Sequence, residues 1–284
     1  MDTLETRELK YFVAIAEELH FGRAAERLGM AQPPLSRAIQ QLERRLGVTL
    51  LERNRRGVTL TGAGQVLLDE ARTLLDATAA AARRTRRAAT ATNRLTLATK
   101  AGANHELLRK LLDAHAAEPG AAEIEVLLCG MGEQGRMLRD GRADVALMQR
   151  PFDALAGFDT EDLKTEQQVA ILPAGHPLAT RTALSLADIS DVPGLPVARW
   201  PEQDGTYLPG PGPEIHDQSQ LAQLIALGHT MAVLCTSARS WLWSAHAAVT
   251  LVDAPYVTTV LAWPAHSRSP EIAALVRTAG RLQL

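Results

Sequence analysis

The sequence predicts a multidomain α/β protein in three parts: a winged helix-turn-helix over residues 1–61, a long linker helix over residues 62–92, and a two-lobed α/β domain over residues 93–284. Three observations lead to this fold class. Apolar residues recur at helical spacing up to residue 46 and are followed by a hairpin pattern. Residues 61–91 contain no proline, and beyond residue 93 strand-like and helix-like segments alternate.

Length and composition indicate a folded protein with more than one domain. A chain of 284 residues exceeds the usual size of a single hydrophobic core. The hydrophobic fraction of 46% is ordinary, and no apolar run approaches the roughly 20 residues that cross a bilayer. The N-terminal MDTLETRELKYF is too polar for a secretory signal, so we expect a cytoplasmic protein without membrane contact.

The charge is distributed unevenly along the chain. Residues 1–94 carry a formal charge of +5 and residues 95–284 carry −7, which together make the net charge of −2. Arginine supplies 26 of the 30 basic side chains, which either suits bidentate contacts to phosphate and guanine or reflects genomic base composition. The N-terminal part is therefore the one expected to meet a polyanion.

Three helices and a hairpin make up the expected N-terminal domain. Helices are predicted over residues 6–20, 23–28 and 32–46, with Gly29 in the turn between the last two. The third helix carries an apolar stripe of Leu35, Ile39, Leu42 and Leu46. Next, VTLLER, the turn NRRG and the alternating VTLT predict a two-stranded wing.

The segment that follows reads as one long helix. A small hydrophobic ridge steps by four and three through Leu67, Ala71, Leu74, Thr78, Ala81 and Thr85. So narrow a ridge cannot bury itself alone, which favours pairing with a second copy of the helix. A solvated helix that only joins two domains is the alternative.

Beyond Asn93 the order of strands and helices predicts two α/β lobes. RLTLAT, EIEVLLC and ADVALM read as strands separated by two helices, an order typical of a parallel sheet. EQQVAILP, GLPVARW and MAVLC read as strands of a second set, with helices at SLADI and over residues 218–227, and VTTVLAWP leads to a last helix over residues 270–282. We expect lobe I over residues 93–162 and 264–284, lobe II over residues 163–263, and a ligand cleft between them.

These residues carry a resemblance to a known family. The string LKYFVAIAEELHFGRAAERLGMAQPPLSRAIQQLERRLGVTLLERNRRGVTLTGAG, followed by GRADVAL, ILPAGHPLA and LIALGHTMAVL, resembles the LysR-type transcriptional regulators over nearly the whole chain. The resemblance implies a winged helix-turn-helix, a pairing linker helix, and an effector domain similar to periplasmic binding proteins. It also implies operator DNA, a small-molecule effector, a homodimer or homotetramer, and RNA polymerase as partners.

The start of the third helix is the expected DNA reader. Proline is tolerated in a first helical turn, because the N–H that it lacks would have no intrahelical partner there. The N-terminal residues of a recognition helix reach base edges, and glutamine suits adenine as arginine suits guanine. Gln32 and Arg37 are expected on bases, Ser36 on a base or a phosphate, and Pro34, where the family usually has a small residue, on a thymine methyl. The expected DNA-binding residues are Arg23, Ala31, Gln32, Pro33, Pro34, Ser36, Arg37, Gln40, Arg53, Arg55, Arg56, Thr59 and Thr61.

The wing supplies several of these residues. Its arginines are expected at the DNA backbone or in the minor groove, with a salt-dependent contribution, unless the hairpin is merely solvated. The two threonines could bond phosphate through their hydroxyls.

The effector site is expected where the first strands of the lobes end. In the family the effector often contacts the start of the first helix of the domain and the turn after its second strand, and a helix N-terminus suits a carboxylate. Many relatives have a hydroxyl residue where Gly102 stands, which leaves a carboxylate ligand open here. The expected effector-binding residues are Thr99, Lys100, Gly102, Ala103, Glu133, Gln149, Arg199, Gln218 and Thr236.

Several interpretations stay open at this point. Lys100 is either an ion-pair partner of the effector or a solvated loop lysine. Glu133 either repels an anion or caps the following helix, and capping is favoured. The Pro- and Gly-rich residues 201–217 form either a lid or, preferably, an exposed variable loop.

No catalytic or metal-binding pattern is found. The nucleophile elbow, the P-loop, the dinucleotide fingerprint and the HExxH motif are all missing, so we expect neither an enzyme nor a cofactor. The eight histidines have no metal-ligand spacing. Cys129 and Cys235 each end a predicted strand and could face the cleft, as a redox switch or, preferably, as small buried hydrophobes.

Overall fold

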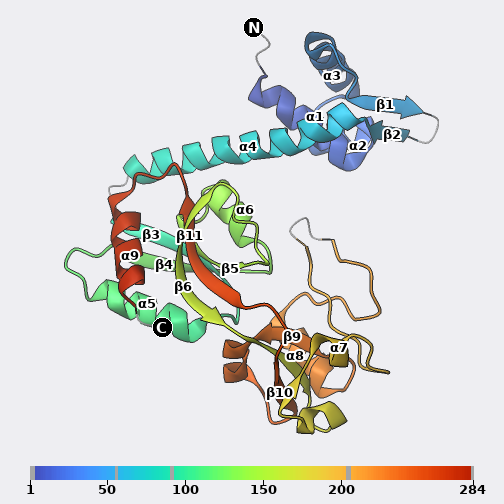
Figure 1. The fold of residues 1–284 in the computed structure, drawn as a ribbon. Helices are drawn as coiled ribbons and strands as arrows, with labels where there is room; N and C mark the ends of the chain where they lie inside the picture. Colours follow the sequence, from blue (N-terminus) through green and yellow to red (C-terminus); the bar gives the residue numbers. More distant parts are fainter. Residues whose placement is uncertain (1–3, 55–56, 90–92, 203–205, 283–284) are drawn as a thin grey trace. The chain divides into compact units, whose positions relative to one another are not determined.

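The computed structural model describes residues 4–54, 57–89, 93–202 and 206–282. The chain divides into two compact units, of which the first comprises residues 1–89 with 139–141 and the second residues 90–138 with 142–284 (Figure 1). Each unit is described by itself.

The first unit contains the predicted helices and wing. Its elements are α1 (Thr6–Glu18), α2 (Phe21–Arg27), α3 (Gln32–Leu46), β1 (Leu51–Asn54), β2 (Gly57–Leu60) and α4 (Gly62–Ala89). Helix α1 ends where Leu19 adopts a left-handed conformation, and His20 Nδ1 then accepts from the Gly22 and Arg23 amides to cap α2. The predicted turn glycine, Gly29, lies between α2 and α3 with φ 65°.

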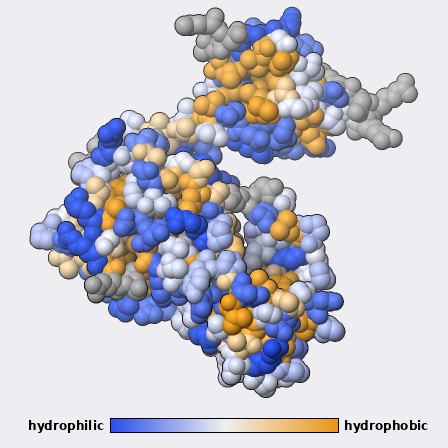
Figure 2. All heavy atoms as spheres, viewed as in Figure 1, coloured by the Kyte–Doolittle hydropathy of each residue, from blue (hydrophilic) through white to orange (hydrophobic). Residues whose placement is uncertain are grey.

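The core of this unit confirms the predicted apolar stripe of α3. Leu35, Ile39 and Leu42 are fully buried against Phe12 and Ile15 of α1, and Leu46 packs at the margin. Burying a side chain of this size contributes about 1.5–3 kcal/mol, so the stripe fixes which face of α3 turns outward. Hydrophobic residues are also visible among hydrophilic ones on the face of this unit that Figure 2 shows.

The wing is tied to α3 by a side chain that the sequence analysis did not single out. Strands β1 and β2 pair antiparallel from Leu51 opposite Leu60 to Asn54 opposite Gly57. Glu43 Oε1 of α3 accepts from the Leu50 amide at 2.8 Å and from the Leu51 amide at 3.1 Å. These two bonds link the position of the wing directly to α3.

Helix α4 packs against the head at its N-terminal end. Leu67, Leu68 and Ala71 are buried in the core of the unit, whereas Val66 and Leu74 are 65% and 46% exposed. Pairing of this helix with a second copy stays a prediction.

The first lobe of the second unit is built on a five-stranded sheet with the order β4-β3-β5-β11-β6. The strands are β3 (Arg94–Lys100), β4 (Glu123–Cys129), β5 (Val145–Arg150), β6 (Phe158–Glu166) and β11 (Val257–Pro264), and the helices are α5 (His105–Ala116), α6 (Gln134–Arg139) and α9 (Pro270–Arg281). Strand β3 pairs parallel with β4 and β5, which confirms the parallel sheet predicted from the alternation. Strands β11 and β6 join it antiparallel.

The second lobe holds a four-stranded sheet with the order β8-β10-β7-β9. Its elements are β7 (Gln168–Pro173), η1 (Pro177–Thr180), β8 (Ala183–Leu184), α7 (Leu186–Ile189), α8 (Gln218–Ala226), β9 (Ala232–Cys235), η2 (Thr236–Trp241) and β10 (His246–Leu251). Strands β6, β8 and β10 were not foreseen from the sequence. The expected strand GLPVARW is wrong: this segment makes only single bridges, from Val197 to Met231 and from Arg199 to Glu214. Pro196 lacks the N–H that a continued ladder would need.

The sheets also place the crossing between the lobes differently from the expected ranges. Strand β11 was expected almost entirely in lobe II, but it pairs with β5 and β6 in the first lobe. The pairing with β6 runs from Val257 opposite Glu166 to Pro264 opposite Phe158, so backbone hydrogen bonds hold both strands in one sheet. Gln167, between β6 and β7, lies where the chain passes between lobes.

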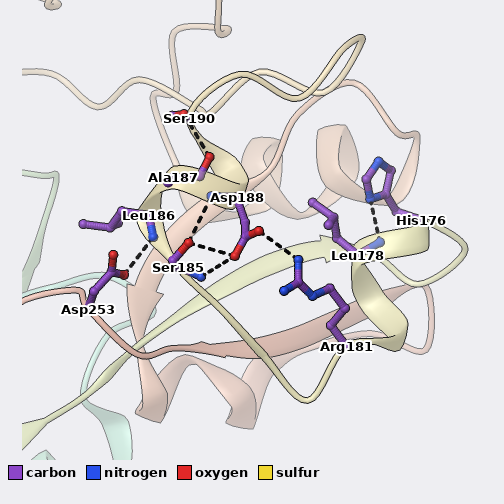
Figure 3. Close-up of polar contacts among 9 residues, drawn as sticks. All are labelled: His176, Leu178, Arg181, Ser185, Leu186, Ala187, Asp188, Ser190 and Asp253. Atoms are coloured by element: carbon purple, nitrogen blue, oxygen red, sulfur yellow. Dashed lines mark hydrogen bonds and ion pairs between the residues drawn. The ribbon is translucent and has the colours of Figure 1, made fainter.

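A polar cluster fixes the short helix α7 in the second lobe (Figure 3). Ser185 caps the helix, and Asp188 Oδ2 accepts hydrogen bonds from the backbone N–H and the hydroxyl of Ser185 at 2.7 and 2.8 Å. Arg181 Nη1 donates to Asp188 at 2.8 Å. Asp253 Oδ1 accepts from the Leu186 amide at 2.7 Å, which ties α7 to the end of β10.

Candidate functional site

The start of α3 presents an exposed polar surface. Its N-cap, Ala31, is extended and makes no side-chain cap bond, and Pro33 and Pro34 occupy the first turn, where the missing N–H groups cost no intrahelical bond. The side chains that the sequence analysis expects at bases, Gln32 and Arg37, are exposed, as is Gln40. Ser36 is half-buried.

Arg37 is available for an external partner. Among the residues that the structure describes, no carboxylate lies within ion-pair distance of its guanidinium, whereas Arg23 pairs with Glu18 at 3.4 Å and Arg27 with Glu17 at 2.8 Å. Arg37, which has no carboxylate partner among the described residues, thus lies on the exposed side of α3 close to a helix N-terminus without a side-chain cap.

The wing residues are placed unevenly. Thr59 is exposed on β2, whereas the Thr61 hydroxyl donates to the Thr49 carbonyl at 2.7 Å and accepts from the Gly64 amide at 3.0 Å. Thr61 therefore holds the start of α4 with bonds inside the unit. The backbone of Arg53 lies in β1, and Arg55 and Arg56 lie outside the described residues.

A cavity of about 660 Å³ lies between the two lobes of the second unit. Five of the nine expected effector-binding residues line it together: Lys100, Gly102, Ala103, Gln149 and Gln218. They come from the ends of β3 and β5, the turn before α5 and the start of α8. This agrees with the rule that ligands bind beyond the carboxyl ends of the strands.

The other four expected residues do not line the cavity, and each has a local reason. Thr99 is buried in the first lobe. Glu133 accepts from the Gly130 amide at 2.7 Å, which closes the turn before α6. The Thr236 hydroxyl donates to the Gln167 carbonyl at 2.9 Å at the crossing between lobes.

Arg199 organises the Pro- and Gly-rich loop. Its guanidinium donates to the carbonyls of Gly212 and Leu208, both at 2.7 Å, and to Glu214 Oε1 at 3.1 Å. The guanidinium carries five N–H donors in fixed directions around its planar edge, so a single arginine can hold several loop segments. Residues 203–205 of this loop lie outside the described residues.

Lys100 is buried, which rules out the solvated loop lysine considered above. Only 5% of the residue is exposed, and Nζ lies 3.2 Å from Asp153 Oδ2 and 3.3 Å from Gln149 Oε1. The backbone N–H of Gln149 donates to Asp153 Oδ2 at 2.6 Å, and the side-chain Nε2 of Gln149 donates to Cys235 Sγ of the other lobe at 3.5 Å. The positive charge of Lys100 is thus balanced by Asp153 within the protein.

The cavity has an aromatic wall that was not predicted from the sequence. Trp200, Trp241 and Trp243, three of the four tryptophans in the chain, line it from the second lobe. His246 positions two of them: its ring stacks on Trp243 at 5.3 Å, meets Trp241 edge-on at 6.0 Å, and accepts from the Trp243 amide at 3.1 Å. The only signal for these residues in the sequence is that tryptophan is rare, and this does not indicate where in the fold the tryptophans lie.

Lysines are concentrated at the same place. Three of the four lysines of this arginine-rich chain, Lys100, Lys110 and Lys164, line the cavity. Each has a carboxylate partner, because Lys110 lies 3.7 Å from Glu106 and Lys164 lies 3.1 Å from the buried Glu166. The charges on the cavity wall are therefore paired and close to balanced.

Both cysteines line the cavity as protonated thiols. Burial raises the pKa of Cys129 to about 11, and burial likewise raises the pKa of Cys235 to about 11. Cys129 Sγ also donates to the Thr99 carbonyl at 3.4 Å. Since the thiolate is the reactive form, neither sulfur is activated at neutral pH.

The described part of the chain has neither a cluster of metal-ligating side chains nor a helix suited to a bilayer. No group of three or more His, Cys, Asp or Glu side chains there has the geometry to hold a metal ion. Nor does any described helix combine the length and the apolar character that crossing a bilayer requires.

A winged helix-turn-helix joined to a two-lobed domain with an interlobe cavity defines a DNA-binding protein with a ligand-binding domain. Residues 6–65 match the family described as "Bacterial regulatory helix-turn-helix protein, lysR family", and residues 88–283 match the "LysR substrate binding domain". The chain belongs to the LysR family, and it is a DNA-binding transcriptional regulator with a substrate-binding domain for an effector.

Relatives support this along most of the chain. The HTH-type transcriptional regulator AlsR of Bacillus subtilis is 32% identical over 83% of this chain and 82% of its own length. IlvR of Caulobacter vibrioides is 30% identical over 96% of this chain and 97% of its own. The solved structure of full-length CbnR in complex with its target DNA is 25% identical, with a TM-score of 0.52 over 98% of this chain and 99% of that one.

Proposed function

We propose that the N-terminal face of α3 reads operator bases through Gln32 and Arg37, with Ser36 at a base or phosphate and Pro34 against a thymine methyl. One observation carries this proposal: Gln32, Pro34 and Arg37 are exposed at the start of one helix, and Arg37 has no carboxylate partner among the described residues. The wing arginines then contribute phosphate or minor-groove contacts that weaken with salt.

The interlobe cavity is the proposed effector site. It unites five residues that the family resemblance implicates, and its walls come from both lobes, so a ligand there contacts two bodies whose separation can change. A ligand that binds one state of closure better shifts the equilibrium towards that state. With α4 pairing two subunits, the altered closure would change the spacing of the DNA-binding heads.

The remaining partners follow from this role. A regulator of this kind acts in the cytoplasm on operator DNA and on RNA polymerase, as a homodimer or homotetramer. The relatives named above are transcriptional regulators, which supports a protein that senses its ligand without converting it.

The experiment that tests the DNA-reading role uses an operator selected from random DNA with the wild-type protein. Arg37→Ala should weaken binding to that operator by about 1–3 kcal/mol and relax the sequence preference of the protein, because a bidentate base contact is lost. Arg109→Ala, which removes an exposed arginine from α5, is the matched control and should leave both unchanged. Equal losses on operator and random DNA for Arg37→Ala would reject its role as a base reader.

The effector role has its own test. Once a cavity ligand is known, its effect on operator affinity and the operator's effect on ligand affinity must be the same factor, since coupling free energy is reciprocal. A cavity ligand that changes neither operator affinity, footprint nor DNA bend would contradict the proposal.

A further inference from the structure

The side chain of Gln218 bridges the two lobes across the cavity. Its Nε2 donates to the Gly102 carbonyl of the first lobe at 3.0 Å, and its Oε1 accepts from Trp241 Nε1 of the second lobe at 3.1 Å. Only this orientation of the amide satisfies both atoms, since the opposite one sets oxygen against oxygen and N–H against N–H. Gln218 is thus hydrogen-bonded to each lobe through a different atom of one carboxamide.

Gly102 leaves the room for this contact. It adopts φ 76°, a left-handed conformation that side chains other than glycine's rarely accept, and a Cβ at this position would collide with the Gln218 amide. The Gln218 carboxamide therefore takes up the space that a side chain at position 102 would need. The carboxamide occupies the space beside the turn that leads into α5.

The two anchors of Gln218 define a chemical complement. The Gly102 carbonyl can only accept a hydrogen bond and the Trp241 indole can only donate one, so they are matched together by a group that has a donor and an acceptor side by side. A carboxamide or a lactam has this arrangement, whereas a carboxylate offers two acceptors and would face the Gly102 oxygen with a negative charge. Such a repulsion inside a partly desolvated site is costly.

The charges around the cavity point the same way. Lys100, with 6% of its side chain exposed, is paired with Asp153, and the carboxylate of Glu166, with 7% exposed, is paired with Lys164. An anion would have to break one of these pairs to gain either ammonium group, and the third lysine on the cavity wall, Lys110, lies 3.7 Å from Glu106. The tryptophan wall adds flat apolar surface for an uncharged body.

We propose that Gln218 is a latch that joins the lobes until a ligand displaces it, and that the ligand is an uncharged molecule whose amide or lactam edge takes over the bonds to Gly102 and Trp241. The proposal rests on the cavity being the effector site. In this proposal Gln218 links ligand specificity to lobe closure. The ligand must replace both hydrogen bonds of the Gln218 carboxamide in order to take its place between the lobes.

The test is rescue of a full-length Gln218→Ala variant by small probes. Propionamide contains the CH2–carboxamide group that the substitution removes, with one additional methyl group, and propionate has the same shape with a negative charge. The indole N–H resonance of Trp241, assigned by its loss in Trp241→Phe, should move in Gln218→Ala and return when propionamide is added. Propionamide should bind Gln218→Ala at least about fivefold more tightly than propionate does, as expected for one net hydrogen bond.

The control variant is Gln223→Ala, which removes an exposed glutamine from the same helix. It should keep the wild-type Trp241 resonance and, like the wild type, should bind propionamide at least about fivefold more weakly than Gln218→Ala. The latch is rejected if Gln218→Ala leaves the Trp241 resonance in place, if propionate binds as well as propionamide, or if neither probe restores the signal. Loss of propionamide binding in the folded double variant Gln218→Ala with Trp241→Phe supports the assigned donor, and retention rejects it.

Operator binding by the same proteins separates the two proposals. A wild-type protein that binds its operator specifically, together with a negative probe result, rejects the latch and leaves the proposed function standing. A wild-type protein that binds no operator rejects the proposed function, whatever the probes do.

Discussion

Lys100 Nζ and Asp153 Oδ2 form a buried ion pair, 3.2 Å apart, at the ends of neighbouring strands beside the interlobe cavity. Both side chains are less than a tenth exposed. The Gln149 side chain accepts from the lysine and the Gln149 amide donates to the aspartate, so one residue satisfies both ions.

Removing one partner of this pair should destabilise the second unit strongly. Asp153→Asn or Lys100→Met leaves a buried charge without compensation, which costs about 3–5 kcal/mol. Urea unfolding of each variant measures this loss. The double variant Lys100→Met with Asp153→Leu should recover much of it, because no charge is then buried. Single variants as stable as the wild type would show that water reaches the pair.

Glu43 should control the stability of the wing through the two amides that it accepts. Glu43→Ala leaves the Leu50 and Leu51 amides without their side-chain acceptor, which we expect to cost about 1–3 kcal/mol of unfolding free energy. Glu43→Gln keeps an acceptor oxygen and should lose less. Hydrogen exchange at the two amides is the direct measurement. Equal protection in Glu43→Ala and wild type would contradict the contact.

The cysteines should react slowly with alkylating reagents at neutral pH. Their pKa values of about 11 leave little thiolate, so the rate with iodoacetamide should rise about tenfold per pH unit between pH 7 and 10 in the folded protein. In urea the rate should level off near the ordinary thiol pKa of about 8.5. Mass spectrometry of Cys129 and Cys235 separately records each profile. A fast reaction at pH 7 at either thiol would indicate an activated cysteine after all.

The ionised carboxylate of Asp188 should stabilise the folded second lobe, and this stabilisation should disappear in acid. The Ser185 amide, the Ser185 hydroxyl and the Arg181 guanidinium lower the pKa of Asp188 from 3.8 to about 2. A depressed folded-state pKa gives a stabilisation that is present above the unfolded pKa and disappears as the pH falls from 3.8 through about 2. Unfolding free energies of wild type and Asp188→Asn should therefore differ at pH 6 and converge towards pH 2.

Asp191→Asn is the matched control for this profile, because Asp191 is an exposed carboxylate close by in the sequence. Its pH dependence should follow that of the wild type. A constant difference between wild type and Asp188→Asn from pH 6 to pH 2 would mean that ionisation of Asp188 does not contribute.

The sequence by itself determined the elements whose signals are local. The stripe of Leu35, Ile39 and Leu42 has the helical period, the prolines mark the first turn of α3, and the alternation after residue 93 predicts the parallel strands β3, β4 and β5. Period, capping and turn chemistry depend on neighbours within a few residues, so they can be read before the chain is folded.

Only the tertiary structure decided which residues meet across the cavity. Strands β6 and β11 lie about 90 residues apart in sequence, and their antiparallel pairing moved β11 into the first lobe. Asp153, which neutralises Lys100, and the tryptophans around Gln218 likewise come from segments without a distinctive local pattern. Long-range hydrogen bonds and charge pairs depend on how distant segments pack together. For this reason the sequence could indicate a ligand site, whereas only the fold determined the charge balance of the cavity and the contact of Gln218 with both lobes.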